Sequence, residues 1–550
     1  MTALHDPTST ETVIYPARLV RTLDRGRPVA DAVAVRGDRV LAVGTMDELA
    51  AYGAARVDDR FRDHVITPGF VEAHTHVFGA RLWDFPYVGF YDRSDPDGRR
   101  WQGCTSIAAV IDRLREAESR LDGDELLVAW GFDAVYLGGA RLSASDLDLV
   151  SRTRPIFVLH ASGHVATVNT AALEIGNVVS HTGVIGVVVD RDGRPDGELQ
   201  EPAAMSLVPG LAQIFGGSDP AAVLHRFASE AANAGCTTVV DLGTATPTTP
   251  DLLATTRAIV DDPSFPVRLS SFLMAGRAID VEGARSLIDD LRGRSSDAFR
   301  VGHIKIVLDG SIQQGTARLL PPGYLEPDRR GIWVTAPETF REVFIAFHAA
   351  GALIHVHCNG DEATELFLVV LAEALERHPR WDHRHTVTHS QLTTADQYAR
   401  LAALGGCANI FSNHIWYWGD QHRDITIGPD RAARMDAAAT ALSLGVPISL
   451  HCDTPVTPIS PLASMHHAVN RLTASGQPLG LDECITPVQA LEALTLGSAF
   501  MLRMDHEIGS IRAGKFADLA VLDADPLSVA PNEIIDIGVV ATARGGVIRS

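Results

Sequence analysis

The sequence predicts an α/β protein built on a closed (β/α)8 TIM-like barrel, and three observations lead to this prediction. Short apolar segments read as strands, helical patterns lie between several of them, and polar residues able to bind metal end the strands. Alternating strands and helices indicate a parallel sheet, and eight such units favour a closed barrel. The predicted strands cover residues 64–71, 236–242, 267–274, 303–308, 353–357, 384–389, 406–411 and 447–452.

Helices between these strands are predicted from their end signals. Asp219-Pro220 opens a helix that runs toward Gly235, with aspartate at the N-cap and proline in the first turn. Thr393-x-x-Asp396 is a capping-box type signal for a helix over 394–404. Further helices are predicted over 337–348, 361–377 and 429–444.

Two regions do not fit a barrel of residues 64–504. Residues 1–63 and 505–550 contain short strands with Gly and Asp turns, and we expect the two ends to pair into one composite β-sandwich. Residues 77–220 separate the first two barrel strands by far more than an ordinary connection. This segment is predicted to be an inserted subdomain, a lid over the barrel mouth.

Composition narrows the class of protein. The chain has 550 residues, 46% of them hydrophobic, which suits a large core, and a net charge of −21, which argues against nucleic acid or an anionic membrane as partner. No apolar run approaches the roughly 18 residues of a membrane span. Residues 1–12 carry no signal-peptide core and the six cysteines show no CxxC spacing. We expect a cytoplasmic protein with a small-molecule substrate; a homodimer is one option for its assembly.

The strongest chemical signal is His74-Thr75-His76 at the end of the first apolar run. Residues i and i+2 of a strand point to the same face, so both imidazoles can reach one cation. Imidazole is a good ligand for zinc and related metals. A lone pair of alternating histidines is as often structural, so the prediction depends on the other strand ends.

Similar polar residues end other predicted strands. His357 and His389 end the fifth and sixth, Asp453 follows the eighth, and Lys305 lies inside the fourth, where a buried cation is costly unless it is paired or used. Taken singly, each has an ordinary structural reading. His303, His355 and His451 are interpreted as core residues, and Asp309 as a turn residue. Together, His74, His76, Lys305, His357, His389 and Asp453 predict one metal site.

The chain resembles the amidohydrolase superfamily, specifically its YtcJ-like (amidohydrolase 3) branch, which includes N-substituted formamide deformylase. The resemblance rests on PGFVEAHTH at 68–76, SGHVATVNTAALEIG at 162–176, IKIVLDGSIQ at 304–313, HVHCNGDEAT at 355–364, THSQL at 388–392, LHCDTPVTPISPL at 450–462 and GSIRAGKFADLAVLDADPL at 509–527. One departure is Thr388, where the branch usually carries a glutamate. The resemblance implies a barrel flanked by a composite β-domain, one or two divalent metals, and hydrolysis, most often of C–N bonds (EC 3.5).

These observations suggest metal-assisted hydrolysis of an amide-type bond. His74, His76, His357 and His389 would bind metal and Asp453 would complete the site. By resemblance to binuclear members, a carboxylated Lys305 would bridge two ions; the alternative is a single ion with Lys305 as a charge partner. Zinc is the default for His-rich sites, and Mn, Co, Ni and Fe are compatible. Asp453 would take a proton from metal-activated water and pass it to the leaving amine.

Candidate substrate contacts come from two places. Asn413 to His422 is predicted to be a loop after the seventh strand, and its Trp416 and Trp418 suggest an apolar wall, although ordinary packing explains them equally well. His414 or His422 would polarise a carbonyl or bond to backbone. In the insertion, His164 and Asn169 match a branch motif.

Other functions stay open at this point. The same centre could hydrolyse a lactone, cyclic imide, ester or phosphoester. A non-catalytic binding or regulatory descendant is disfavoured, because buried His and Asp residues without metal would be poorly satisfied.

Overall fold

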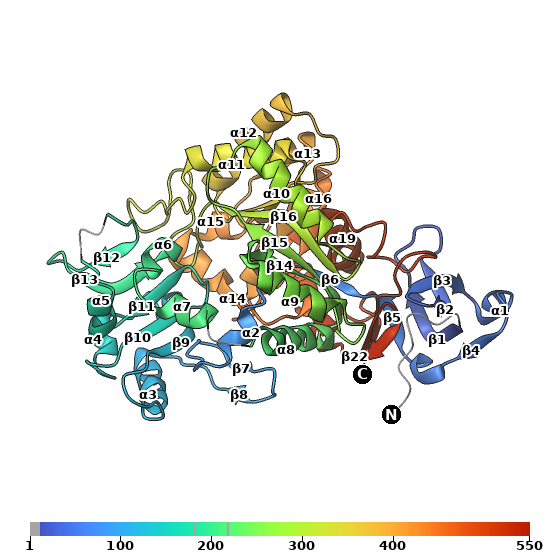
Figure 1. Cartoon of the computed structure of the whole chain (residues 1–550), viewed down its shortest axis with the longest axis horizontal. Helices are drawn as coiled ribbons and strands as arrows, with labels where there is room; N and C mark the ends of the chain where they lie inside the picture. The colour runs from blue at the N-terminus through green and yellow to red at the C-terminus, as the bar shows by residue number, and fades with distance from the viewer. Residues whose placement is uncertain (1–10, 180–182, 217–218, 550) are drawn as a thin grey trace.

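The computed structural model describes residues 11–179, 183–216 and 219–549. The prediction that residues 1–12 carry no signal-peptide core concerns a segment that lies mostly outside the described residues. Three parts lie in a row (Figure 1): a sheet built from both chain ends, a central barrel, and the inserted subdomain. Among the described residues, no helix combines the length and apolar character needed to cross a bilayer.

The central part is the predicted parallel barrel. Each strand pairs with the next in chain order, and the first and last meet where Thr75 bridges Thr454 and the Asp453 N–H donates to the His74 carbonyl (3.1 Å). The strands are β6 (Phe70–Thr75), β14 (Cys236–Thr244), β15 (Arg268–Met274), β16 (Phe299–Val307), β17 (Ile354–Cys358), β18 (Thr386–His389), β19 (Cys407–Ile410) and β20 (Ile448–Leu450).

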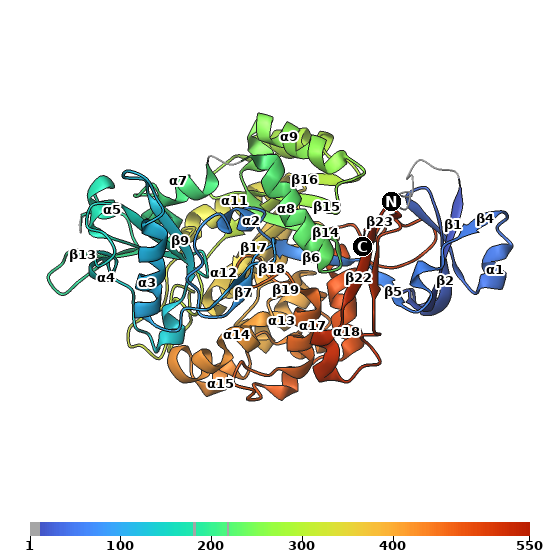
Figure 2. The ribbon, with the colours of Figure 1, turned by 90° about the horizontal axis from the view of Figure 1, so that it is seen from below.

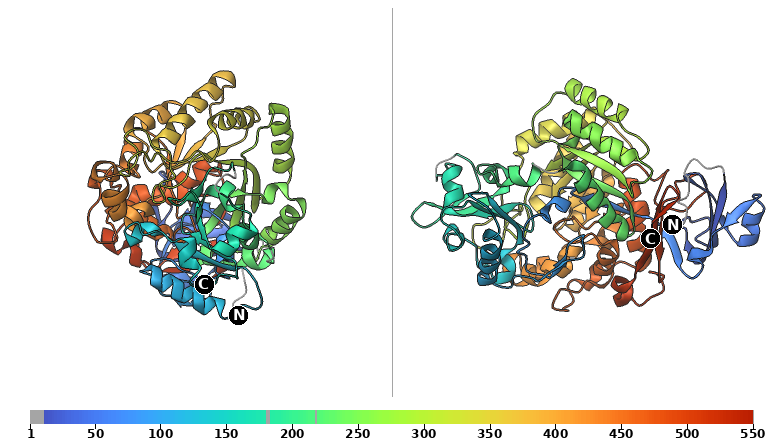
Figure 3. Two further views of the ribbon diagram at one scale, coloured as in Figure 1. Left: turned by 90° about the vertical axis from the view of Figure 1, so that its left-hand side faces the viewer. Right: turned by 60° about the horizontal axis from the view of Figure 1, so that its bottom comes forward.

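Helices surround the barrel, as the end-on view in Figure 3 shows. Asp219 caps the first of these helices, as predicted. The capping box of α13 uses Thr394 and Gln397, one residue later than predicted. The Gln397 side chain accepts a hydrogen bond from the Thr394 N–H (3.1 Å), which determines this position. The main outer helices are α8 (Pro220–Asn233), α9 (Pro250–Asp261), α10 (Val281–Gly293), α11 (Pro337–Ala349), α12 (Asp361–Arg377), α13 (Ala395–Ala403), α16 (Ala438–Ser443), α17 (Pro461–Asn470), α18 (Pro487–Glu492) and α19 (Ser498–Met501).

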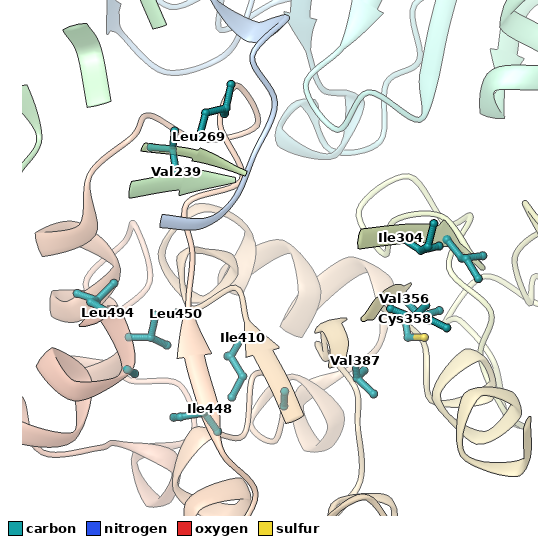
Figure 4. Packing of buried hydrophobic residues seen from close by; sticks show 14 of the residues in the cluster. Val239, Leu269, Ile304, Val356, Cys358, Val387, Ile410, Ile448, Leu450 and Leu494 are labelled. Atoms are coloured by element: carbon teal, nitrogen blue, oxygen red, sulfur yellow. The ribbon is translucent and has the colours of Figure 1, made fainter. Parts of the chain in front are cut away.

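The core between strands and helices fixes which residues face the barrel interior. Ile304, Val356 and Val387 lie on successive strands in the hydrophobic layer (Figure 4) and belong to the main core cluster with the helix residues. Because strand side chains alternate, Lys305 and His357 must then point to the other side, into the barrel.

The predicted strand at 64–71 is in fact two strands that meet at Gly69. β5 (Val65–Pro68) pairs antiparallel with a strand from the C-terminal end, and only β6 belongs to the barrel. A Cβ at Gly69 would lie 2.1 Å from Thr237 Oγ1, so this close approach requires glycine where the chain enters the barrel.

The two chain ends build one sheet, with strands in the order β23-β22-β21-β5-β1-β2-β3 and β4 beside β1. A buried ion pair between Arg268 and Asp518 (2.7 Å) connects it to the barrel. Its strands are β1 (Thr12–Arg21), β2 (Val29–Arg36), β3 (Arg39–Gly44), β4 (Ala55–Val57), β21 (Leu519–Leu522), β22 (Val539–Arg544) and β23 (Val547–Arg549), and α1 (Met46–Ala50) follows β3.

The insertion after the first barrel strand has its own sheet, in the order β12-β13-β11-β10-β9, with hydrophobic clusters of its own. Figure 2 shows it beyond the barrel, on the side away from the composite sheet. It contains β7 (Arg93–Ser94), β8 (Arg100–Trp101), β9 (Leu127–Phe132), β10 (Ile156–His160), β11 (Val165–Val168), β12 (Val187–Val189), β13 (Pro195–Gln200), α2 (Gly79–Leu82), α3 (Ile107–Glu118), α4 (Ala144–Leu147), α5 (Thr170–Ile175), α6 (Glu201–Met205) and α7 (Gly210–Phe215).

Two predicted elements differ from the structure near the seventh strand. The expected loop over 413–422 is helix α14 (Asn413–Gln421), which continues into one π-helical turn. The expected helix over 429–444 is broken into α15 (Pro429–Ala432) and α16, because Asp436 between them adopts a left-handed conformation (φ 50°). The Asp436 carboxylate lies 3.2 Å from His414 Nδ1 in α14. This contact with another helix accounts for the break at Asp436.

Candidate metal centre

The barrel brings the predicted ligands to one mouth, at the carboxyl ends of its strands. His74 is the last residue but one of β6, and His76 directly follows that strand. His357 lies on β17, His389 ends β18, and Asp453 lies three residues beyond β20. Four buried side chains form the tightest group, with ligand atoms all within 4.8 Å of one another: His74, His389, His451 and Asp453. We call this set the mouth group.

Two further predicted ligands border the mouth group. His76 Nε2 lies 3.4 Å from Asp453 Oδ1, and His357 Nδ1 lies 3.0 Å from His389 Nε2. His76 is the more open of the two, with a side chain that is 20% exposed, whereas His357 is buried. Five of the predicted residues therefore form one continuous cluster around the mouth group.

His451 is part of the mouth group although the sequence suggests a core residue. Its Nε2 lies 3.2 Å from His389 Nδ1, and its Nδ1 lies 2.8 Å from Asn409 Oδ1. An amide oxygen only accepts, and the Asn409 amide nitrogen donates to the Ala73 carbonyl (3.4 Å), so His451 carries its proton on Nδ1 and has a lone pair on Nε2. The signal in the sequence is His451-x-Asp453, the same alternation as His74-x-His76.

Backbone conformation at the mouth is unusual for residues other than glycine. His389 (φ 71°) and Asp453 (φ 53°) are both in the left-handed region, which side chains rarely adopt and which costs of order 1–3 kcal/mol. Hydrogen bonds hold the chain there: the Ser390 N–H donates to Cys358 and the Asp453 N–H donates to His74 (both 3.1 Å). Such conformations cluster at functional sites, which is consistent with a role for both side chains.

Several buried polar atoms at the mouth lack hydrogen-bond partners. These are Lys305 Nζ, His74 Nδ1 and Asp453 Oδ1. Asp453 Oδ1 is only 3.3 Å from His74 Nε2, but without hydrogen-bond geometry. Since buried polar groups are nearly always satisfied, the Asp453 oxygen and the His74 nitrogen indicate a missing positive partner, and this set of His and Asp atoms fits a divalent metal ion.

Electrostatics favour the forms that bind metal. Burial holds the pKa of His74 and His389 well below the usual range, and the charge on Lys305 lowers it further, so both imidazoles are neutral. Burial lowers the pKa of Lys305 to about 7, with nearby Asp453 opposing the shift. Burial would raise the pKa of Asp453, but His76, His451 and Lys305 outweigh it and leave the pKa below its ordinary value.

The insertion places His164 directly over the mouth. Its ring lies 5.1 Å from that of His357, and its Nδ1 lies 2.7 Å from Glu201 Oε2. Burial would lower the pKa of His164, but the Glu201 carboxylate outweighs burial and raises it. Glu201 was not predicted from the sequence. It has a left-handed backbone (φ 66°), and a Cβ at Gly310 would lie 2.3 Å from its Oε1.

The predicted substrate residues of α14 differ in how near they lie to the mouth group. The His414 ring lies 6.4 Å from that of His389, and its Nδ1 lies 3.2 Å from Asp436. His422 is buried farther along, between Thr426 (2.8 Å) and Gln391 (3.1 Å). Of these two histidines, only His414 has a ring contact with a residue of the mouth group.

The two tryptophans pack against the insertion. Trp418 is buried, and its indole N–H donates to Asp133 Oδ2 (2.9 Å). Trp416 stacks on His467 and touches Tyr91. Asn169, the other motif residue of the insertion, caps α5 and bonds to the backbone of Arg154, which is a structural role.

Thr388, where the related branch usually carries a glutamate, has an unsatisfied side chain. Its hydroxyl is buried and has no hydrogen-bond partner among the described residues. The two ring nitrogens of His389 lie against other imidazoles, 3.0 Å from His357 Nδ1 and 3.2 Å from His451 Nε2.

Comparison with known proteins agrees with this geometry. Residues 62–549 match the model of the amidohydrolase family. The chain belongs to the amidohydrolase family. Its solved structural relatives include an uncharacterized metal-dependent hydrolase from Pyrococcus horikoshii OT3, with a TM-score of 0.69 and 18% identity over 95% of this chain and 99% of that one.

Two curated relatives of this amidohydrolase span nearly the whole chain. N-substituted formamide deformylase from Arthrobacter pascens is 27% identical and covers 96% of both chains. Protein LONG AFTER FAR-RED 3 from Arabidopsis thaliana is 26% identical over 96% of this chain and 89% of its own. The family and its closed barrel confirm the resemblance seen in the sequence.

Proposed function

We propose that this protein hydrolyses a non-peptide, amide-type C–N bond, such as that of an N-substituted formamide or another N-acyl amine. The observation that carries the proposal is the mouth group, a buried set of three histidines and one aspartate with unpartnered atoms at the mouth of the barrel. The match to a relative named for deformylating N-substituted formamides supports the choice of bond.

Five residues would hold the metal, with zinc as the first choice for a site rich in histidine. When bound, the metal supplies a Lewis acid that makes water more acidic and polarises a carbonyl. The ligands are His74, His76, His357, His389 and Asp453. His451 would orient His389 through the 3.2 Å contact between their ring nitrogens.

We propose that the neutral amine of Lys305 adds to carbon dioxide and loses a proton, and that the resulting carbamate would supply oxygen ligands for a metal centre of two ions. Two features support this: an Nζ atom that is buried without a partner, and a pKa lowered to about 7, which leaves a fraction of the amine neutral and nucleophilic. With a single metal ion, the same amine would serve as a charge partner of Asp453.

Asp453 is proposed to move the proton. Its Oδ1 accepts no hydrogen bond, so it is free to take a proton from the attacking water. The same oxygen then gives that proton to the nitrogen of the leaving amine as the C–N bond breaks. His164, held by Glu201 at 2.7 Å, would donate a hydrogen bond to the substrate, and His414 would contact it from α14. Trp416, Trp418 and His422 remain candidates for the outer wall.

A substrate panel tests the proposal. Purified protein would be chelated, reconstituted separately with Zn²⁺, Mn²⁺ and Co²⁺, and assayed on N-benzylformamide, N-acetylbenzylamine, a cyclic imide, a lactone and an aryl ester. We expect amine release from at least one acyclic amide, abolished in His74→Ala. Turnover of only the lactone or ester, or of no substrate by metal-loaded protein, would contradict the proposal.

A further inference from the structure

An aromatic recess is lined by residues of the insertion and of α14. Figure 1 shows these two parts of the ribbon. The enclosed part of the recess measures about 30 Å³, and the hollow continues into open solvent. Its walls include one cation and five large aromatic residues: Arg93, Tyr87, Trp130, Tyr136, Tyr417 and Trp418. We call it the Arg93 recess.

The Arg93 recess adjoins the loops that carry the functional groups. Val456, which lines it, donates its N–H to the carbonyl of Asp453 (2.8 Å). Ala161, on the opposite loop, also lines it and lies three residues before His164. A molecule with one end between Asp453 and His164 could therefore extend its other end toward this recess.

Three buried donors in the recess lack acceptors within the described chain. They are the Nε of Arg93, the indole Nε1 of Trp130 and the hydroxyl of Tyr136. Nη1 of Arg93 donates to the carbonyl of Pro455 (2.7 Å), so the guanidinium is held in place. Leaving such donors buried without acceptors costs about 1–3 kcal/mol each, which indicates a ligand with acceptor atoms.

The charge of Arg93 is also incompletely balanced. Its guanidinium lies 5.3 Å from the ring centre of Trp130 and 5.4 Å from that of Trp83. It lowers the pKa of Glu230, but burial dominates and keeps the pKa of that carboxyl raised. A guanidinium pairs best with a planar carboxylate, and the surrounding rings suit a flat apolar group.

We propose that the Arg93 recess binds the part of the substrate remote from the cleaved bond, and that this part is an aromatic ring bearing a carboxylate. The ring would stack among the tyrosines and tryptophans, and the carboxylate would accept from Arg93, Trp130 and Tyr136. The position relative to the cleaved bond rests on the proposed function, but the recess can be tested without turnover.

Direct binding to the full-length protein as purified tests the recess. The probes are 4-methylbenzoate, its neutral analogue 4-methylbenzyl alcohol and the non-aromatic cyclohexanecarboxylate, titrated calorimetrically. We expect 4-methylbenzoate to bind at least tenfold more tightly than either of the others. Arg93→Met should weaken it at least tenfold, and Tyr136→Phe two- to fivefold. Arg99→Met, which removes an exposed guanidinium stacked on Trp101, is the matched control and should change nothing.

Two outcomes would overturn the assignment: equal affinity for the acid and the alcohol, or unchanged affinity for the acid in both Arg93→Met and Tyr136→Phe. Because Arg93 also holds the Pro455 loop, the Tyr136→Phe variant is decisive if Arg93→Met unfolds at lower temperature. Tyr136→Phe leaves that tether intact.

Paired substrates separate the recess from the proposed reaction. N-benzylformamide and its 4-carboxy derivative differ only in the group that the recess would recognise. We expect Arg93→Met to raise the ratio of KM for the acid to KM for the neutral substrate at least tenfold. Hydrolysis of both with no effect of Arg93→Met would contradict the recess alone. Binding as expected without hydrolysis of either would contradict the reaction alone.

Discussion

Two groups of buried histidines lie at opposite ends of the same strand, β18. His389 ends the strand and belongs to the mouth group. His385 precedes the strand and contacts His348 and His383, and we call these three residues the base group. Both groups are buried, dense and rich in imidazole, yet their hydrogen bonding differs completely.

In the base group every ring nitrogen has a partner inside the chain. His348 contacts His385 (2.8 Å) and the carbonyl of His378 (2.7 Å), and His385 Nδ1 accepts from the Ile354 N–H. His383 bonds to the carbonyl of Leu404 (2.7 Å) and accepts from the His385 N–H. Four backbone groups close this hydrogen-bond network, so the base group is part of the fold.

In the mouth group some polar atoms have no hydrogen-bond partner. His74 Nδ1 and Asp453 Oδ1 have no partner, and neither does the nearby Lys305 Nζ. The difference shows that clustering and burial of histidines do not identify a metal site. The mouth group differs from the base group in that the protein leaves some of its polar atoms unsatisfied, as a bound cation would require.

The largest expected effect is that of Asp453→Asn. An amide cannot accept and return the proton, so kcat should fall about 100- to 10,000-fold on a hydrolysed substrate. The variant should keep more of its metal than of its turnover, as measured by elemental analysis beside steady-state kinetics. Wild-type kcat in this variant would remove Asp453 from the mechanism and weaken the contrast between the two groups.

Metal removal should affect stability through the mouth group alone. A metal present at 100 times its Kd stabilises the folded state by about 2.7 kcal/mol, so chelation should lower the free energy of unfolding by about that amount. The same decrease is expected in His348→Ala, where the base group is damaged. Chelation should change nothing in His74→Ala. If chelator leaves the free energy of unfolding of all three proteins unchanged, the prediction is wrong.

His385→Ala should cost stability without affecting metal. The change leaves the Ile354 N–H and one ring nitrogen of His348 without hydrogen-bond partners. Each buried unpaired group costs about 1–3 kcal/mol. Denaturant titration would measure the loss, and kcat and metal content should match wild type. If metal content falls with stability, the base group is not merely structural.

The smallest expected effect is that of Trp418→Phe, which tests a third buried polar contact. Burial raises the pKa of Asp133 to about 6 even though Trp418 and Gln314 donate to it. Removing the indole donor destabilises the ionised carboxylate more than the neutral acid. Besides the pH-independent cost of the smaller side chain, the variant should therefore lose about 1 kcal/mol more at pH 7 than well below pH 6. A loss that grows as the pH falls would reverse the sign and contradict the assignment.

The sequence predicted those features of the fold and the site that depend on patterns within one short segment. Strand ends carrying His74-x-His76, His357, His389 and Asp453 predict the barrel and its mouth because alternation and chain order determine both. The composite sheet also follows from short strands at both ends, although the division at Gly69 depends on a contact with Thr237, far away in sequence.

Contacts between distant segments were not predictable in this way. His451 looks like a core residue until Asn409 and His389 are placed beside it. Glu201 carries no motif, yet it holds His164 over the mouth. The chain over 413–422 has loop-like composition but forms α14, because its aromatic residues pack against the insertion, as Trp416 does against Tyr91.

The most direct test of the account is the metal content of three proteins purified in parallel: wild type, His389→Ala and His385→Ala. These variants remove one imidazole from each end of β18. We predict about one or two equivalents of divalent metal in wild type and in His385→Ala, and less than about a tenth of that in His389→Ala. Equal metal content in the two variants, or a wild-type protein that takes up no metal, would contradict it.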